Sequence, residues 1–114
     1  MFKLRFFIVL VILSAIVVLN AHPASNVSLT FDKEQNLLSV EFEHKVRNAE
    51  DHYISEVTVY LNDTEIITQK ISKQQSAEGG KLLYVIVDTK VGDKLSVRID
   101  CNKTGKKTGE IVIE

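Results

Sequence analysis

Alternation of apolar and polar residues with a period of two is the feature of this sequence that most limits its fold. Successive side chains of a β-strand point to opposite faces of a sheet, so such a pattern predicts strands with one buried face. It runs through four separate segments. Their apolar positions, which we expect to be mostly buried, are Val27, Leu29, Phe31, Leu38, Val40, Phe42, Val57, Val59, Leu61, Leu95, Val97 and Ile99.

Three further segments are rich in β-branched residues and also favour strands: Glu65–Ile71, Leu82–Val87 and Glu110–Ile113. Turn-forming residues separate the segments, at Asp32–Asn36, Asn62-Asp63, Gly79-Gly80, Gly92-Asp93 and Gly105–Gly109. No stretch keeps a helical period for three turns. About seven short strands in a chain of this size predict an all-β fold, a seven-stranded antiparallel immunoglobulin-like sandwich.

The first 21 residues differ in composition from the rest of the chain. Lys3 and Arg5 precede the apolar run Phe6–Leu19, and Leu19-Asn20-Ala21 follows it. A basic N-terminal region, a short apolar stretch and a small residue before the cleavage site are typical of a secretory signal peptide. The 14 residues of the run fall short of the roughly 18 to 20 that span a bilayer. We therefore expect a signal peptide at residues 1–21.

These features together predict one exported domain, extracellular or periplasmic, at residues 22–114. The alternative is a retained segment at residues 6–19 that anchors the chain, which is the one membrane contact that we expect. A net charge of −1 gives no basic surface for nucleic acid, so we expect no such partner. A single cysteine can form no internal disulfide.

Four side chains are candidate metal ligands: His22, His44, His52 and Cys101. His44 and Cys101 each continue the inward parity of a strand, so each is expected on the core side where its strand ends. Imidazole with thiolate suits iron, zinc or copper better than magnesium or calcium. Composition alone favours a simpler interpretation, with surface histidines and a cysteine that is a small buried apolar group.

The local sequences carry more information than the composition. His52-Tyr53-Ile54 leads into a strand, His44 precedes it across a polar loop, and Cys101-Asn102 opens a loop that reaches Gly105; His22 precedes the first strand. This layout resembles the desulfoferrodoxin and superoxide reductase family, whose domain is an immunoglobulin-like sandwich. The resemblance implies a mononuclear non-haem ferrous iron bound by these histidines and the cysteine. It also implies reduction of superoxide to peroxide, with an electron donor that the sequence does not identify.

The sequence departs from the family pattern at three places. Thr104 stands where the family has a late histidine, Asn20-Ala21 where it has a Glu-Lys pair, and Lys45 where it has a proline. With threonine at position 104 in place of the family's histidine, one nitrogen ligand is missing. If cleavage follows Ala21, the free amine of His22 could chelate the metal together with its ring and so replace it. Lys45 places a cation beside His44, which would attract a small anion such as superoxide.

Two other functions stay open at this point. The same scaffold could carry or sense copper, zinc or iron without turnover, or it could be a metal-free immunoglobulin-like module that binds a partner. Bound metal in the purified protein would exclude the metal-free module. Superoxide consumption would then distinguish the reductase from the carrier or sensor.

Overall fold

The computed structural model describes residues 22–114, so the predicted signal peptide or anchor lies outside the described residues. Within this part of the chain, no helix is long and apolar enough to cross a membrane. The described residues form seven strands: β1 (Asn26–Asp32), β2 (Leu37–Glu43), β3 (Ile54–Leu61), β4 (Thr64–Lys70), β5 (Gly79–Val85), β6 (Lys94–Cys101) and β7 (Lys106–Val112).

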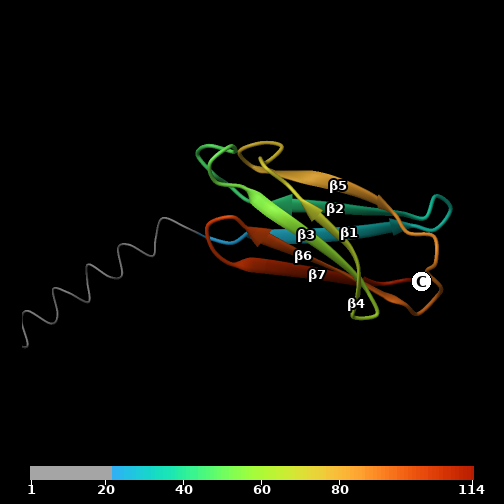
Figure 1. The fold of residues 1–114 in the computed structure, drawn as a ribbon. Coiled ribbons are helices and arrows are strands. Elements are labelled where there is room, and N and C mark those ends of the chain that lie inside the picture. Colours follow the sequence, from blue (N-terminus) through green and yellow to red (C-terminus); the bar gives the residue numbers. More distant parts are fainter. Residues whose placement is uncertain (1–21) are drawn as a thin grey trace, which may run out of the picture.

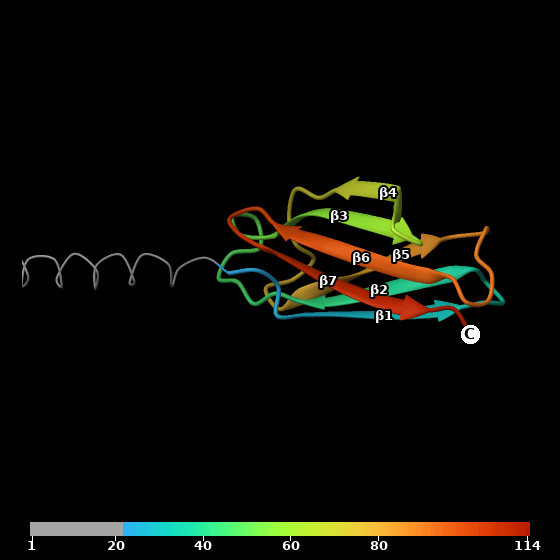
Figure 2. The same ribbon diagram turned by 90° about the horizontal axis from the view of Figure 1, so that it is seen from below.

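The strands form two antiparallel sheets (Figure 1), one of three strands in the order β1-β2-β5 and one of four in the order β4-β3-β6-β7. Figure 2 shows the sheets as two layers packed face to face. Non-consecutive strands pair inside each sheet, β2 with β5 and β3 with β6. Such crossing connections between two sheets are typical of immunoglobulin-like sandwiches. The predicted fold class is therefore confirmed.

The core lies between the two inward faces, as the alternation predicts. Of the twelve apolar positions that define the four alternating segments, the buried ones are Leu38, Val40, Phe42, Val57, Val59, Leu95, Val97 and Ile99. The other four pack against this core while partly exposed. Three of them lie on β1, which is an edge strand. An edge strand has a neighbour on one side only, so its inward side chains stay closer to solvent.

Two glycine-containing turns were predicted where the structure has strand. Gly79 and Gly80 begin β5 instead of making a turn before it, and Gly109 lies within β7. A Cβ on Gly80 would lie 2.9 Å from the Phe42 ring, and one on Gly109 would lie 2.9 Å from the Val27 carbonyl oxygen. Glycine is therefore present because neighbouring strands approach closely there, and not because the chain turns.

The two long sides of the sandwich differ in how tightly they close. On one side, Gly109 lets β7 lie against the backbone of β1. On the other side, the Tyr84 hydroxyl of β5 donates to Gln69 Oε1 of β4 at 2.7 Å, and burial raises the pKa of Tyr84 to about 12. A cleft of about 230 Å³ opens on this side, and its lining includes Phe42, Ile54, Ile71, Gln74 and Leu82.

Candidate metal centre

Three imidazoles and one thiol meet at one end of the sandwich. His44 directly follows β2, Cys101 is the last residue of β6, and His52 lies two residues before β3. Ile54 and Cys101 are paired across the β3–β6 ladder, so this strand pairing brings the segment of His52 to the thiol. We call this end of the molecule the histidine end.

His22 reaches the same place because the chain before β1 packs against the loop after β6. Gly105 in that loop has a φ of +81°, and a Cβ on it would lie 2.8 Å from Pro23. Ala24 is buried in the core, and the Ser25 amide donates to the Glu43 carbonyl at 2.9 Å. These contacts fix the residues that follow His22, and so they place its ring over the end of the sandwich.

The ligand atoms of His22, His44 and His52 lie within 4.8 Å of one another. The ring centroids are 4.7 Å apart for His44 and His52, and 5.1 Å apart for each pair that includes His22. Among residues 22–114, no other three histidine, cysteine or acidic side chains come together in this way. The group can therefore bind a metal ion.

The thiol of Cys101 borders this group. Its Sγ lies 3.1 Å from His52 Nε2. Metal–nitrogen and metal–sulfur bonds of about 2.1 and 2.3 Å that meet at a right angle hold their donor atoms about 3.1 Å apart. The observed distance thus suits two ligands of one ion, and without an ion the same contact is a hydrogen bond whose donor is set by the tautomer of His52. The structure thus brings His52 and Cys101 into contact, and their joint binding of a metal stays a prediction.

The four side chains differ in their exposure. His44 is fully buried and Cys101 is buried, while His52 is partly exposed and His22 is exposed. The buried pair lies at the bottom of the site and the exposed histidine at its rim. Solvent therefore reaches the group from the side of His22.

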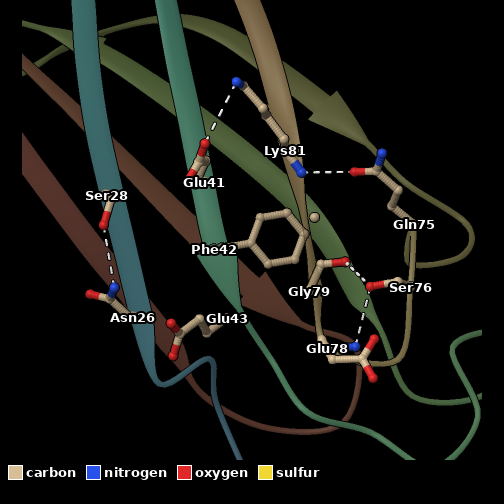
Figure 3. A pocket seen from close by; sticks show the side chains of 11 residues that line it. Asn26, Ser28, Glu41, Phe42, Glu43, Gln75, Ser76, Glu78, Gly79 and Lys81 are labelled. Atoms are coloured by element: carbon tan, nitrogen blue, oxygen red, sulfur yellow. Dashed lines mark hydrogen bonds and ion pairs between the residues drawn. The ribbon is translucent and has the colours of Figure 1, made fainter.

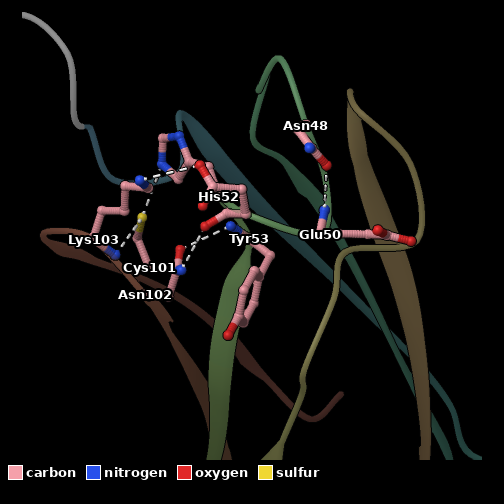
Figure 4. A network of polar contacts seen from close by, with 8 residues as sticks. Asn48, Glu50, His52, Tyr53, Cys101, Asn102 and Lys103 are labelled. Carbon is pink, nitrogen blue, oxygen red and sulfur yellow. Dashed lines mark hydrogen bonds and ion pairs between the residues drawn. The ribbon is translucent and has the colours of Figure 1, made fainter.

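Two polar groups contact the Cys101 sulfur. The Lys103 amide donates to Sγ at 3.4 Å, and His52 contacts the sulfur from the other side. Figure 4 shows both contacts. A thiolate, not a thiol, is the form that binds a metal.

The environment of His52 favours its neutral, metal-binding form. Burial lowers the pKa of His52, and the nearby imidazoles of His44 and His22 lower it further, as does Lys103 to a smaller extent. An imidazole ring binds a metal only through an unprotonated nitrogen. At neutral pH, His52 is therefore in the state that a metal site requires.

Asn102 joins the segment of His52 to the loop after Cys101 (Figure 4). Its Oδ1 accepts from the Tyr53 amide at 2.8 Å and its Nδ2 donates to the Asp51 carbonyl at 2.9 Å. Its own amide donates to the Tyr53 carbonyl at 2.9 Å. These three bonds hold the residues on both sides of His52, so Asn102 keeps the imidazole beside the sulfur.

Gln74 is a site residue that the sequence analysis missed. It is buried, and its Oε1 lies 2.7 Å from His44 Nδ1. It belongs to the connection between β4 and β5, far from His44 along the chain. One glutamine in a polar loop gives no local sequence signal for such a contact.

Two residues singled out in the sequence are exposed in the structure. Lys45 follows His44, and Thr104 lies in the loop after Cys101. The attraction of an anion by Lys45 stays a prediction. Lys103 is a second cation close to the site, since its Nζ is 3.3 Å from Asp51 Oδ2 and its amide faces the Cys101 sulfur.

A separate groove of about 320 Å³ lies near the same end of the three-stranded sheet (Figure 3). Its acidic side chains are Glu41, Glu43 and Glu78, and Lys81 pairs with Glu41 at 3.6 Å. Neither the imidazoles of the histidine end nor the Cys101 thiol lines it. The groove and the histidine group are thus distinct features.

No protein-family model, no curated protein and no solved structure matches this chain. The structure by itself supports an immunoglobulin-like sandwich whose three histidines can bind a metal ion. The kind of metal and the reaction belong to the proposal below.

Proposed function

We propose that this chain is a superoxide-reductase-like protein that binds one non-haem iron through His22, His44, His52 and Cys101. The observation that carries the proposal is the Cys101 sulfur, 3.1 Å from His52 Nε2 at the edge of the histidine group. Imidazole nitrogens combined with a thiolate favour transition metals such as iron over magnesium or calcium. The family resemblance of the sequence supports iron and superoxide in particular.

Bound ferrous iron would supply the one electron that, with two protons from solvent, converts superoxide to hydrogen peroxide, and an external electron donor would restore it. The protein's own residues have separate tasks. His44 and Cys101 offer ligand atoms from the buried side, and His22 offers one from the exposed side. Lys45 directly follows His44, and Lys103, whose Nζ pairs with Asp51 at 3.3 Å, follows Cys101 by two residues. Their positive charges would draw an anion toward the site.

Export through residues 1–21 belongs to the same proposal. A superoxide reductase outside the cytoplasm would need a donor in that compartment. The chain has a single cysteine, so it has no further thiols with which to hold a second iron centre of its own.

The test is anaerobic loading of the full chain with Fe²⁺, followed by measurement of bound iron, thiolate-to-iron absorption and superoxide consumption. Cys101→Ser should abolish the absorption band and the consumption, because a serine hydroxyl stays protonated near neutral pH and binds Fe²⁺ weakly. Thr104→Ser, in the same loop, is the matched control and should keep both. Superoxide consumption that survives in Cys101→Ser would refute the proposal.

Thr104→His tests the missing nitrogen ligand. A histidine at this exposed loop position should raise iron affinity or superoxide consumption by roughly 10-fold or more, the size of effect typical for changes around a metal site. If the amine of His22 already serves as a ligand, Thr104→His will change little and acetylation of a mature N-terminus will release metal. No response to either change would refute this account of the ligands.

A metal carrier or sensor is the second candidate, and Thr104 is the observation that favours it. Three imidazoles and one thiolate form a four-ligand set that zinc and copper also accept. Metal bound at one equivalent without superoxide consumption would assign this function. Absence of any bound metal would instead favour a metal-free binding module.

A further inference from the structure

Gln74 is buried to 2% exposure, and its side-chain amide has a hydrogen-bond partner in every direction. Its Nε2 donates to the carbonyl oxygens of His44 at 2.7 Å and Ser76 at 2.8 Å. Its Oε1 accepts from the Ile54 amide at 3.2 Å and lies 2.7 Å from His44 Nδ1. Its own backbone amide donates to the Ala49 carbonyl at 2.9 Å.

These partners determine which way the amide of Gln74 points. In the reverse orientation, Oε1 would face two carbonyl oxygens and the NH₂ group would face the Ile54 N–H. Both contacts would be repulsive in a buried place, where an unpaired polar group is costly. The oxygen of the amide therefore faces His44 Nδ1.

The position of the Gln74 oxygen determines the proton on His44. An amide oxygen cannot donate, so a hydrogen bond of 2.7 Å requires the proton on Nδ1 of the imidazole. In a neutral ring the other nitrogen, Nε2, then has a free lone pair. Nε2 lies on the side of the histidine group, 3.2 Å from the carbonyl oxygen of His22, which is also an acceptor and competes for the single proton of a neutral ring. The contact to Gln74 is shorter, at 2.7 Å, and so marks the stronger hydrogen bond. The proton is therefore assigned to Nδ1, and the His22 carbonyl has to turn away when a metal binds Nε2.

We infer that Gln74 is a positioning residue, which fixes His44 as the Nδ1–H tautomer and presents its Nε2 to a metal ion. This inference rests on the metal site proposed above and adds what prepares that site before a metal arrives. A hydrogen bond on the second ring nitrogen is a common way in which proteins orient a ligand histidine. Here a neutral amide makes that bond, and the same amide holds the backbone of His44 and the start of β3.

The first experiment needs neither metal nor a variant. Long-range ¹H–¹⁵N correlation spectra of the full chain, metal-free and at a pH where the ring is neutral, report which nitrogen of His44 carries the proton. We expect Nδ1–H. Observation of Nε2–H would overturn the inference, even if the chain binds metal.

The second experiment compares two neighbouring glutamines. Gln74→Met keeps the length of the side chain and removes the acceptor, so Zn²⁺ affinity should fall roughly 10- to 100-fold and His44 should populate both tautomers. Gln75→Met is the matched control, since exposed Gln75 accepts from the Lys81 amide at 2.8 Å and contacts no histidine. It should leave Zn²⁺ affinity and the His44 tautomer unchanged.

If Gln74→Met does not fold, the tautomer of His44 in the wild-type chain decides the inference by itself. Equal losses of Zn²⁺ affinity in Gln74→Met and Gln75→Met, or an unchanged tautomer in Gln74→Met, would overturn the inference. A wild-type chain with Nδ1–H on His44 that binds neither Zn²⁺ nor Fe²⁺ would instead refute the proposed function and support the tautomer assignment.

Discussion

Strand β6 joins two clusters of polar groups that are organised in opposite ways. Before its first residue, Asp93 accepts from Asn62 Nδ2 and from the Lys90 amide, each at 2.9 Å, and Asn62 Oδ1 accepts from the Lys94 amide at 2.9 Å. We call this cluster the aspartate end. At the last residue of β6, ligand atoms of three imidazoles instead lie within 4.8 Å of one another, and the Cys101 thiol contacts one of these rings.

The difference shows which cluster can stabilise the fold alone. At the aspartate end, donors meet acceptors, so the network is complete within the protein and contributes to stability directly. At the histidine end, Gln74 and Asn102 hold the backbone and one ring, but ligand nitrogens of three imidazoles lie within 4.8 Å of one another. A cation would give this group its missing partner. We therefore expect the aspartate end to act on stability and the histidine end to act on binding.

Addition of metal should give the largest effect. Zn²⁺ at 100 times its dissociation constant adds about 2.7 kcal/mol, which raises the unfolding temperature of a domain of this size by about 10 to 20 °C. Differential scanning calorimetry of the full chain with and without Zn²⁺ measures this shift. His44→Ala should remove the shift, and Asp93→Asn should keep it. A shift that persists in His44→Ala would break the distinction between the two ends.

A pair of asparagines gives the next largest effect. Asn62 and Asn102 each use both side-chain atoms to hold a neighbouring segment, at opposite ends of β6. Each alanine variant should lose about 1 to 2 kcal/mol of stability, because two hydrogen bonds disappear. Only Asn102→Ala should also weaken Zn²⁺ binding, roughly 10-fold. Urea unfolding and calorimetric titration measure the two quantities, and equal losses of Zn²⁺ affinity would contradict the comparison.

Lowering the pH should test the contribution of the aspartate end to stability independently of the histidine end. Hydrogen bonds from Asn62 and from the Lys90 amide lower the pKa of Asp93 below its usual range. The unfolded chain therefore binds a proton at Asp93 before the folded chain does. The stability from this group is full above the unfolded value, about 3.9, and is lost as pH falls through the folded value.

Asp93→Asn should accordingly have a shallower loss of stability than the wild type below about pH 4, on the principle that links proton binding to stability. Urea unfolding at a series of acidic pH values measures the slope. Asp88→Asn, a change of the same charge at an exposed residue, is the control. If the stability of Asp93→Asn depends on pH as steeply as that of the wild type, the aspartate end does not contribute to acid sensitivity.

The smallest expected effect concerns Lys45 and Lys103. Lys45→Ala and Lys103→Ala should each slow the reaction with superoxide a few-fold at low ionic strength, and less at high salt, because screening weakens the attraction of an anion. Stopped-flow rates at two salt concentrations measure this. Lys90→Ala, a change of the same charge at the aspartate end, should leave the rate unchanged. A rate that depends on Lys103 and not on Lys45 would show that the prediction of anion attraction by Lys45 is wrong.

The features predicted well from sequence are those that depend on strand parity. Parity alone placed His44 and Cys101 on the core side at the ends of their strands, because side chains alternate whatever the partner strand is. It could not show that Val27 and its neighbours on β1 stay partly exposed, since that depends on the position of β1 at a sheet edge. Local pattern predicts turns at Gly80 and Gly109 because it does not reveal how closely a neighbouring strand approaches.

Gln74 escaped prediction for a related reason. Its role comes from contacts with His44 and Ile54, which are 30 and 20 residues away in the sequence. Asn102 was found only as part of a family pattern, and its bonds to Asp51 and Tyr53 appear only in the fold. Sequence therefore predicted that these histidines come together better than it predicted the residues that contact them.

The unequal sides of the sandwich bear on how quickly a metal would leave. Where Gly109 lies against Val27, backbone meets backbone, and separation of the sheets there costs close contacts. The opposite side is joined by the hydrogen bond between Tyr84 and Gln69 and opens on a cleft that reaches Gln74. Brief separation of β4 from β5 would admit water to the amide that orients His44 while the rest of the fold stays intact. The lifetime of a bound ion would then follow this local fluctuation of one edge, and could be far shorter than the lifetime of the folded protein.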